Sequence, residues 1–223
     1  MINQLKSLGI EKGKPFNPTP QTTSILNAAA QEARDLLEQR YSIGVPTFFE
    51  GTQWRAAAQP EAVQGQSTRY GMHDVYATDA RGLIYTYGFI GIKRLGTAQY
   101  YLMAIRDRDG RSLSGANTYR LTVPANAPVE EYWSATAYDR ATHALIKGMP
   151  GASRASQDHA VQRNADGSYD IYFGPTPPQG KEANWVPTRP DGEFEVLFRL
   201  YRPTKALFEK TWTLPDIEQI AVQ

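Results

Sequence analysis

Between Thr97 and Tyr201 apolar and polar residues alternate in several short runs, and this two-residue period constrains the fold more than any other feature. Successive side chains of an extended strand point to opposite faces, so alternation predicts strands with one buried side. Segments 118–124, 132–139 and 193–203 show the pattern most clearly. Turn residues separate the runs and no helical pattern comes between them. We therefore predict a mainly β fold, an antiparallel β-sandwich or jelly roll.

The same alternation predicts which side chains share a face of their strand. The three sets are Tyr119, Leu121 and Val123, then Trp133, Ala135 and Ala137, and finally Phe194, Val196, Phe198 and Leu200. Tyr119 and Trp133 are expected to be core residues. Two further features belong to this part of the chain. Residues 107–110 read Asp-Arg-Asp-Gly and predict a turn after a strand that begins at Thr97. Segment 158–174 is predicted to form a hairpin whose turn runs from Asn164 to Gly167.

The N-terminal part is predicted to be helical. Thr19 is suited to cap a helix whose first residue is Pro20, and apolar residues at helical spacing continue until Gly44. We expect this amphipathic helix to pack on a core. Residues 47–76 are interpreted as short helices and loops, and residues 77–95 as a further helix that Asp79 caps. The predicted organisation is a small helical region, residues 1–92, followed by a β-sandwich domain, residues 93–223.

The charge balance excludes some function classes. The 24 Lys and Arg residues almost equal the 23 Asp and Glu residues, so no strong field attracts nucleic acid or an anionic membrane. The chain has no Cys, which rules out disulfides and thiolate metal sites. Neither a signal peptide nor a membrane span is visible in the sequence, so it predicts a cytoplasmic protein as written. Export as part of a longer parent is left open.

Known catalytic motifs are missing from the sequence. His73, His143 and His159 show no metal-ligand spacing, and neither a GxSxG elbow nor a phosphate-binding loop occurs. We interpret these histidines as surface or loop residues and predict no metal and no cofactor. A three-histidine site assembled from distant strands is left open.

Six residues are the candidates for a ligand site, since they combine polar groups with aromatic surroundings. They are Tyr138 and Asp139 at the end of one strand, Asn184 and Trp185 in a loop before a proline, and Arg199 and Tyr201 on one face of the last long strand. A buried Arg199 needs a partner, because an unpaired buried charge is costly. Asp139 is the expected structural partner, and a ligand anion bound bidentately is the alternative.

The order of motifs in the C-terminal half resembles a bacterial family, the domain of unknown function 1214. The resemblance spans roughly residues 90–220. The motifs are "DRDGRSLSGANTYRLTVP", "YWSATAYD", "NADGSYDIYFG", "EANWVPT", "FRLYRP" and "TWTLPDIE". The resemblance implies a jelly-roll-like sandwich behind a small helical part, and longer relatives that also carry the domain of unknown function 1254. It implies no catalytic residues, because a shared fold does not define an activity.

Three functions remain open on the sequence. The first is a module that binds a small molecule or glycan in a cleft lined by Tyr and Trp. The second is a hydrolase acting on a small ester, amide or phosphate, with Tyr138, Arg199 and one histidine as the reacting groups. The third is a structural module that forms a homo-oligomer through the N-terminal helix. Small-molecule binding is the function we place first.

Overall fold

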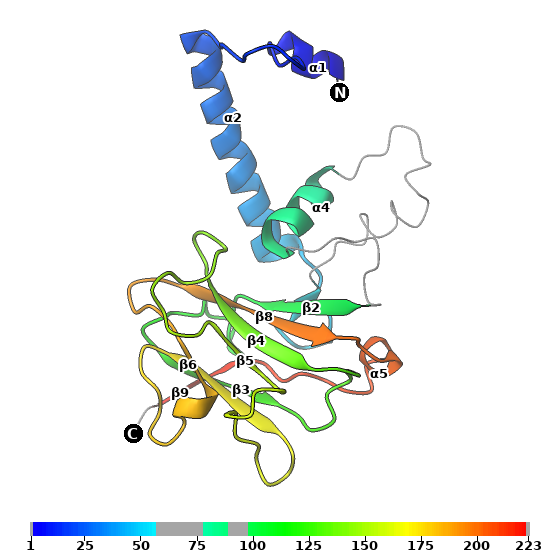
Figure 1. Cartoon of the computed structure of the whole chain (residues 1–223), viewed down its shortest axis with the longest axis vertical. Coiled ribbons are helices and arrows are strands. Elements are labelled where there is room, and N and C mark those ends of the chain that lie inside the picture. Colours follow the sequence, from blue (N-terminus) through cyan, green and yellow to red (C-terminus); the bar gives the residue numbers. More distant parts are fainter. Residues whose placement is uncertain (1, 57–77, 89–97, 222–223) are drawn as a thin grey trace. The chain divides into compact units, whose positions relative to one another are not determined.

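The computed structural model describes residues 2–56, 78–88 and 98–221 of the chain (Figure 1). These residues form two compact units, Met1–Gly44 and Val45–Gln223. The predicted boundary between residues 92 and 93 lies in a segment outside the described residues, so it stays a prediction. Within the predicted helical region, residues 55–56 form a strand, and residues 57–77 and 89–92 are not described.

The first unit consists of helix α1 (Ile2–Ser7), helix α2 (Pro20–Gln39) and the π-helical turn η1 (Arg40–Gly44). The predicted start of α2 is confirmed, since the Thr19 hydroxyl accepts a hydrogen bond from the backbone N–H of Thr22 at 3.1 Å. This bond satisfies one of the N–H groups that the first turn of a helix leaves without a partner. Proline at the first position has no N–H to satisfy.

The prediction that α2 packs in a core is wrong. None of its residues is buried, and Ile25 and Leu36 are 59% and 44% exposed. The helical period shows that one side of a helix is apolar, but it carries no information about what covers that side.

The second unit contains two β-sheets (Figure 1). Every pair of neighbours in the five-stranded sheet is antiparallel. Its strands, in spatial order, are β1 (Arg55–Ala56), β2 (Gln99–Ala104), β8 (Phe194–Tyr201), β4 (Trp133–Asp139) and β5 (Ser153–Ala155). The two-residue strand β1 lies in the region predicted to hold only short helices and loops.

The four-stranded sheet contains a parallel pair. In spatial order its strands are β7 (Trp185–Pro187), β6 (Tyr169–Gly174), β3 (Thr118–Val123) and β9 (Glu218–Ile220). Strand β7 runs parallel to β6, so the prediction of a purely antiparallel arrangement is wrong at this pair. The segment of β7 was predicted as a loop, because three residues are too few to display a two-residue period.

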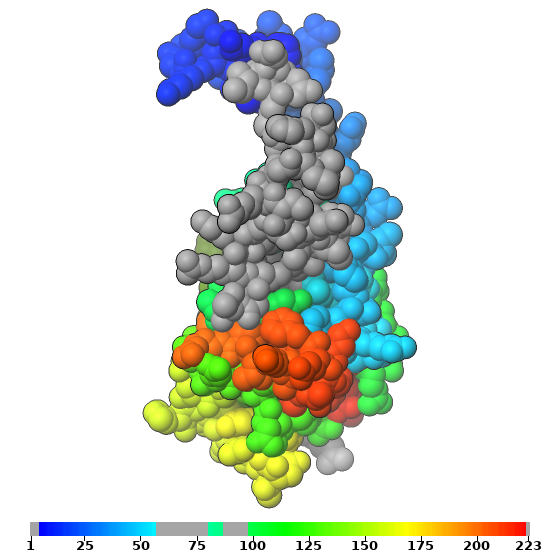
Figure 2. All heavy atoms as spheres, turned by 90° about the vertical axis from the view of Figure 1, so that its right-hand side faces the viewer, coloured from blue at the N-terminus to red at the C-terminus, as the bar shows by residue number. Residues whose placement is uncertain are grey.

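Short helices complete the unit. Helix α4 (Thr78–Leu83) and the π-helical turn η2 (Ile84–Gly88) confirm the described part of the helix predicted for residues 77–95, although Asp79 lies inside the helix rather than at its cap. The 3-10 helix η4 (Glu182–Asn184) precedes β7, and α5 (Lys205–Phe208) follows β8 at the surface (Figure 2, orange to red). Among the described helices, none has both the length and the apolar character needed to cross a lipid bilayer.

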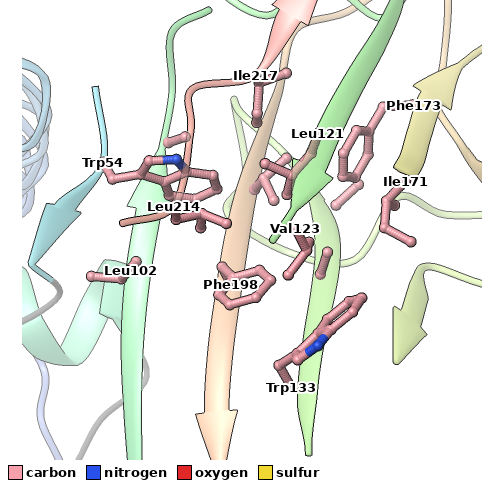
Figure 3. Close-up of a cluster of buried hydrophobic side chains, with 14 of the residues drawn as sticks. Trp54, Leu102, Leu121, Val123, Trp133, Ile171, Phe173, Phe198, Leu214 and Ile217 are labelled. Carbon is pink, nitrogen blue, oxygen red and sulfur yellow. The ribbon is translucent and has the colours of Figure 1, made fainter. Parts of the chain in front are cut away.

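The inward faces of both sheets meet in one hydrophobic core (Figure 3). Tyr119 and Trp133, the two expected core residues, belong to it, as do the eight residues predicted to share their faces or the corresponding face of β8. Ring pairs connect the sheets: Trp133 of β4 lies 5.3 Å from Tyr169 of β6, and Phe194 of β8 lies 5.8 Å from Phe173 of β6. Aromatic pairs at such distances add about 0.5–1.5 kcal/mol each beyond the area that they bury.

The hairpin predicted for residues 158–174 is only half correct. The turn is present, since Gly167 N–H donates to Asn164 O at 3.0 Å and Asn164 N–H to Ser168 O at 2.8 Å. Residues 158–163, however, do not form the first strand. The backbone of Gln162 instead forms hydrogen bonds with a side chain: the Asn184 amide accepts from Gln162 N–H and donates to Gln162 O.

Tyr100 gives a prediction for alkaline stability. Its ring packs between Phe48 and Phe208, with centroids at 5.2 and 5.3 Å, and burial raises its pKa from 10.0 to about 12. A pKa that is higher in the folded state stabilises the fold below pH 10, and this contribution is lost as pH rises through about 12. We therefore expect the wild type to lose about 2 kcal/mol of its unfolding free energy over this pH range because of Tyr100, and we expect Tyr100→Phe not to show this loss. Urea unfolding of both proteins as a function of pH measures the difference. An unchanged pH profile would contradict this assignment.

Candidate functional site

The face of the five-stranded sheet that points away from the core carries three of the six candidates: Tyr138, Arg199 and Tyr201. Strand register places Tyr101 of β2 opposite Arg199 of β8, and Arg199 opposite Ser134 of β4. Tyr138 and Tyr201 share this face by alternation along their strands. We call the set Tyr101, Ser134, Tyr138, Arg199 and Tyr201 the Arg199 face.

The half-buried guanidinium of Arg199 lies at the centre of this face. Its Cζ atom is 4.9 Å from the centroid of the Tyr101 ring and 5.3 Å from that of Tyr138, and its Nη2 donates a hydrogen bond to the Tyr138 hydroxyl. Both distances are within the range of cation–π attraction. No carboxylate pairs with Arg199 in the part of the chain that the structure describes.

The expected ion pair between Arg199 and Asp139 is therefore wrong. Asp139 follows Tyr138 on strand β4, so alternation turns its side chain away from the face that holds Arg199. The Asp139 carboxylate instead accepts from Thr142 N–H at 2.9 Å and the Thr142 hydroxyl at 2.8 Å, and Arg189 Nη2 lies 3.4 Å away. Asp139 thus fixes the loop after β4.

The Tyr101 hydroxyl of the Arg199 face stays protonated at neutral pH. Burial raises the pKa of Tyr101, and the nearby Arg199 charge offsets part of this effect. Tyr201 stacks on Tyr132, with ring centroids 4.1 Å apart and ring planes 18° apart. Burial and the hydrogen bond with Tyr201 raise the pKa of Tyr132. The face thus places tyrosine hydroxyls, which both donate and accept hydrogen bonds, around one cation.

A buried ionisable cluster, which the sequence did not predict, adjoins this face. Glu195 shares a face of β8 with Arg199 and lies opposite Tyr138. Its Oε1 is 2.8 Å from His143 Nδ1, and its Oε2 is 3.9 Å from Arg140 Nε. The His143 and Glu195 side chains are only 5% and 1% exposed. His143 has a φ of 54°, a conformation that few non-glycine residues adopt.

His159 does not join this cluster, because it is exposed. His73 lies outside the described residues. His143 lies in a loop, as the sequence predicted, but it is buried. Within residues 2–56, 78–88 and 98–221, no group of three or more His, Cys, Asp or Glu side chains is arranged to hold a metal ion.

Trp185 belongs to β7 of the other sheet, and Asn184 ends the helix η4 just before it, so the structure does not bring all six candidates together. The Asn184 amide accepts from Gln162 N–H at 2.7 Å and donates to Gln162 O and to Asp170 O, both at 2.8 Å. The Trp185 indole N–H donates to Gly174 O at 2.9 Å. These contacts hold β6, β7 and residues 161–163 together, which is a structural role.

This role makes Asn184→Ala a test of the fold. The substitution leaves three backbone groups without their side-chain partner in a region where Asn184 itself is 4% exposed, so we expect a loss of about 3 kcal/mol. Chemical denaturation measures the effect. Asn164→Ala is the matched control, because the Asn164 side chain makes one hydrogen bond, to the Ser168 hydroxyl. Equal losses for the two variants would contradict the role assigned to Asn184.

Taken together, the two sheets and the Arg199 face define a mostly β protein in which one sheet carries a polar, tyrosine-rich face. Tyr101, Ser134 and Tyr138 are buried on this face, and Arg199 and Tyr201 are half-buried. Residues 98–205, just under half of the chain, match a family described as "Protein of unknown function (DUF1214)". The match includes the whole Arg199 face and the His143–Glu195 cluster. The companion domain implied by the resemblance stays a prediction.

The solved structures that resemble this chain include two proteins of which it covers about half, and no curated protein matches it. The VPA0106 protein from Vibrio parahaemolyticus is 19% identical, with a TM-score of 0.51 over 99% of this chain and 50% of that one. An uncharacterised protein from Burkholderia cenocepacia is 18% identical, with a TM-score of 0.41 over 100% of this chain and 49% of that one. The chain therefore spans about half the length of these proteins. At this identity the first likeness concerns the fold alone.

Proposed function

We propose that the second unit is a small-molecule binding module and that its ligand carries a carboxylate or phosphate group held by Arg199. The observation that carries this proposal is a half-buried guanidinium with two tyrosine rings beside it and no carboxylate partner among the described residues. A cation removed in part from water is stabilised by a counter-ion. An anionic ligand group supplies one.

The geometry suits a planar anion. The hydrogen bond to Tyr138 uses one of the five N–H groups of Arg199, and a guanidinium edge with two parallel N–H groups matches a carboxylate. The Tyr101 and Tyr138 rings limit the side-chain motion of Arg199, so little entropy is lost when the ligand binds. Tyrosine hydroxyls nearby are suited to bind hydroxyl groups of the same ligand. Small hydroxy acids and acidic sugars have this combination of groups.

The experiment is a thermal-shift screen followed by calorimetry. The panel contains small carboxylates, inorganic phosphate, uronic acids and matched neutral sugars. We expect the carboxylates or the acidic sugars to raise Tm in a concentration-dependent manner, because a ligand that binds only the folded state stabilises it. If the neutral sugars alone stabilise the protein, the proposed anion site is wrong.

Variants connect such binding to Arg199. Arg199→Met should lower the affinity by about a hundredfold, and Arg199→Lys should restore only part of it, since an ammonium cannot form the bidentate contact. Arg163→Met is the matched control. Arg163 lies 5.8 Å from the Tyr169 ring centroid, so it too is an arginine beside a tyrosine, but that tyrosine belongs to the other sheet. Equal losses in Arg199→Met and Arg163→Met would count against a specific site.

A hydrolase is the second candidate, and the His143–Glu195 pair is the observation that favours it. A carboxylate 2.8 Å from Nδ1 fixes the ring orientation and the tautomer of a histidine that acts as a base. Activity against chromogenic esters that His143→Gln abolishes, while the unfolding midpoint stays unchanged, would favour hydrolysis. A His143→Gln variant that retains the activity of the wild type would remove this candidate.

The jelly-roll arrangement predicted from the sequence remains part of the proposal. Its support is the order in which the chain visits the two sheets: β2, β4 and β8 lie in the five-stranded sheet, and β3, β6 and β9 lie in the other. Strand β8 also pairs between β2 and β4, although it follows both in the sequence. Connections that cross from sheet to sheet in this way are typical of jelly rolls and other Greek-key folds.

A further inference from the structure

We infer that α2 is a homodimerisation helix and that it pairs with the α2 of a second copy of this chain in an antiparallel orientation. The starting observation is that a 20-residue helix has no buried residue. A helix of this length is marginally stable in water by itself, and most helices in proteins are stabilised when an apolar side is covered. Ile25 and Leu36 remain 59% and 44% exposed on such a side.

The apolar side of α2 is continuous along the helix. At 100° per residue its members fall within less than half of the circumference. They are Ile25, Leu26, Ala29, Ala30, Ala33, Leu36 and Leu37. Polar residues such as Asn27, Gln31 and Asp35 fall on the other side, where the Gln31 amide donates to the Asp35 carboxylate at 2.8 Å. An arc of this width fits the groove of one neighbouring helix.

The order of residue sizes along this side is symmetric. Large residues stand at both ends, Ile25 and Leu26 in the N-terminal half and Leu36 and Leu37 in the C-terminal half, and alanines lie between them. A two-fold axis perpendicular to the helix, close to Gln31, places the large pair of each copy against the large pair at the opposite end of its partner. It also places Ala29 against Ala33 of the second copy. Alanines at the crossing point allow the helix axes to approach closely.

Charge decides the orientation. Glu32 is exposed and borders the apolar side between Ile25 and Leu36. In a parallel pair in register, Glu32 would lie beside the same carboxylate of the partner, which is repulsive. In the antiparallel pair it lies beside the partner's alanines. The antiparallel arrangement also places each helix N-terminus near the C-terminus of the other helix, so the helix dipoles attract.

The first experiment measures the mass of the full chain by light scattering and sedimentation from low to high micromolar concentration. We expect a monomer–dimer equilibrium in the wild type. Leu36→Glu places a charge on the apolar side of the helix, where it would face the large residues of the partner, and should weaken dimerisation by about tenfold or more. Asn27→Glu adds the same charge on the polar side of the same helix and should leave dimerisation unchanged. A wild type that is monomeric at every concentration overturns the inference, as does a dimer that Leu36→Glu does not weaken.

The second experiment tests the orientation, and the absence of native cysteine makes it simple. An equimolar mixture of Leu26→Cys and Leu36→Cys chains is oxidised and analysed without reductant. The antiparallel pair predicts that the mixed disulfide dominates, since each position faces the other across the two-fold axis. Dominant disulfides between two Leu36→Cys chains would show a parallel pair and overturn the inferred orientation.

Discussion

Replacing Trp54 with alanine should destabilise the protein by about 4 kcal/mol, one of the two largest losses that we expect from a single substitution. The Trp54 side chain is fully buried, and its ring lies 6.2 Å from the Phe198 ring in the core. Its indole N–H donates to Pro215 O at 2.8 Å. Alanine would leave both a cavity and a carbonyl without its donor. Equilibrium unfolding in urea measures the loss.

The size of the effect tests where the folding unit ends. Trp54 and Pro215 both lie outside the segment that matches the family, residues 98–205, yet they meet at its core. Trp54→Phe is the matched control, because it keeps an aromatic ring and removes the hydrogen bond, for which we expect about 1–2 kcal/mol. A loss below 1 kcal/mol for Trp54→Ala would mean that residues 45–56 contribute little to the core.

The sequence predicted the long strands because their pattern is local. Strands β3, β4 and β8 each contain at least six residues, enough to display the two-residue period that assigns each side chain to a face. Strands β1 and β7 have two and three residues, and their pairing depends on partners far away in the chain. Trp54 was not predicted to be a core residue for the same reason, since no periodic pattern surrounds it.

In the candidate site, too, the sequence predicted only what a local pattern encodes. Tyr138, Arg199 and Tyr201 were predicted to be site residues, and the structure places them on one face. Alternation on β4 already separates Tyr138 from Asp139, so the pattern itself argues against the ion pair between Asp139 and Arg199. The contact between His143 and Glu195 joins residues 52 positions apart through a loop with a positive φ. No local pattern encodes such a contact, and the only signal was a glutamate inside an apolar strand.

Replacing Glu195 with alanine is the second substitution for which we expect a large loss of stability. Glu195 is 1% exposed and contacts His143 and Arg140, so Glu195→Ala removes the carboxylate from two basic side chains in a buried place. We expect a loss of about 3–5 kcal/mol, because breaking a buried pair leaves its partner without compensation. Glu195→Gln keeps the shape and an oxygen acceptor and should lose about half as much. Urea unfolding of the three proteins measures both losses.

The matched control for Glu195 is a neighbour on the same segment. Glu193 is exposed, and Glu193→Ala should change the stability by less than about 0.5 kcal/mol. Comparison of Glu195→Ala with the double variant Glu195→Ala, His143→Ala isolates the pair itself. If the Glu195 carboxylate stabilises the fold through His143, then adding His143→Ala to the Glu195→Ala variant should lower the free energy of unfolding much less than His143→Ala lowers it in the wild type. Fully additive losses would show that Glu195 acts through Arg140 or through packing instead.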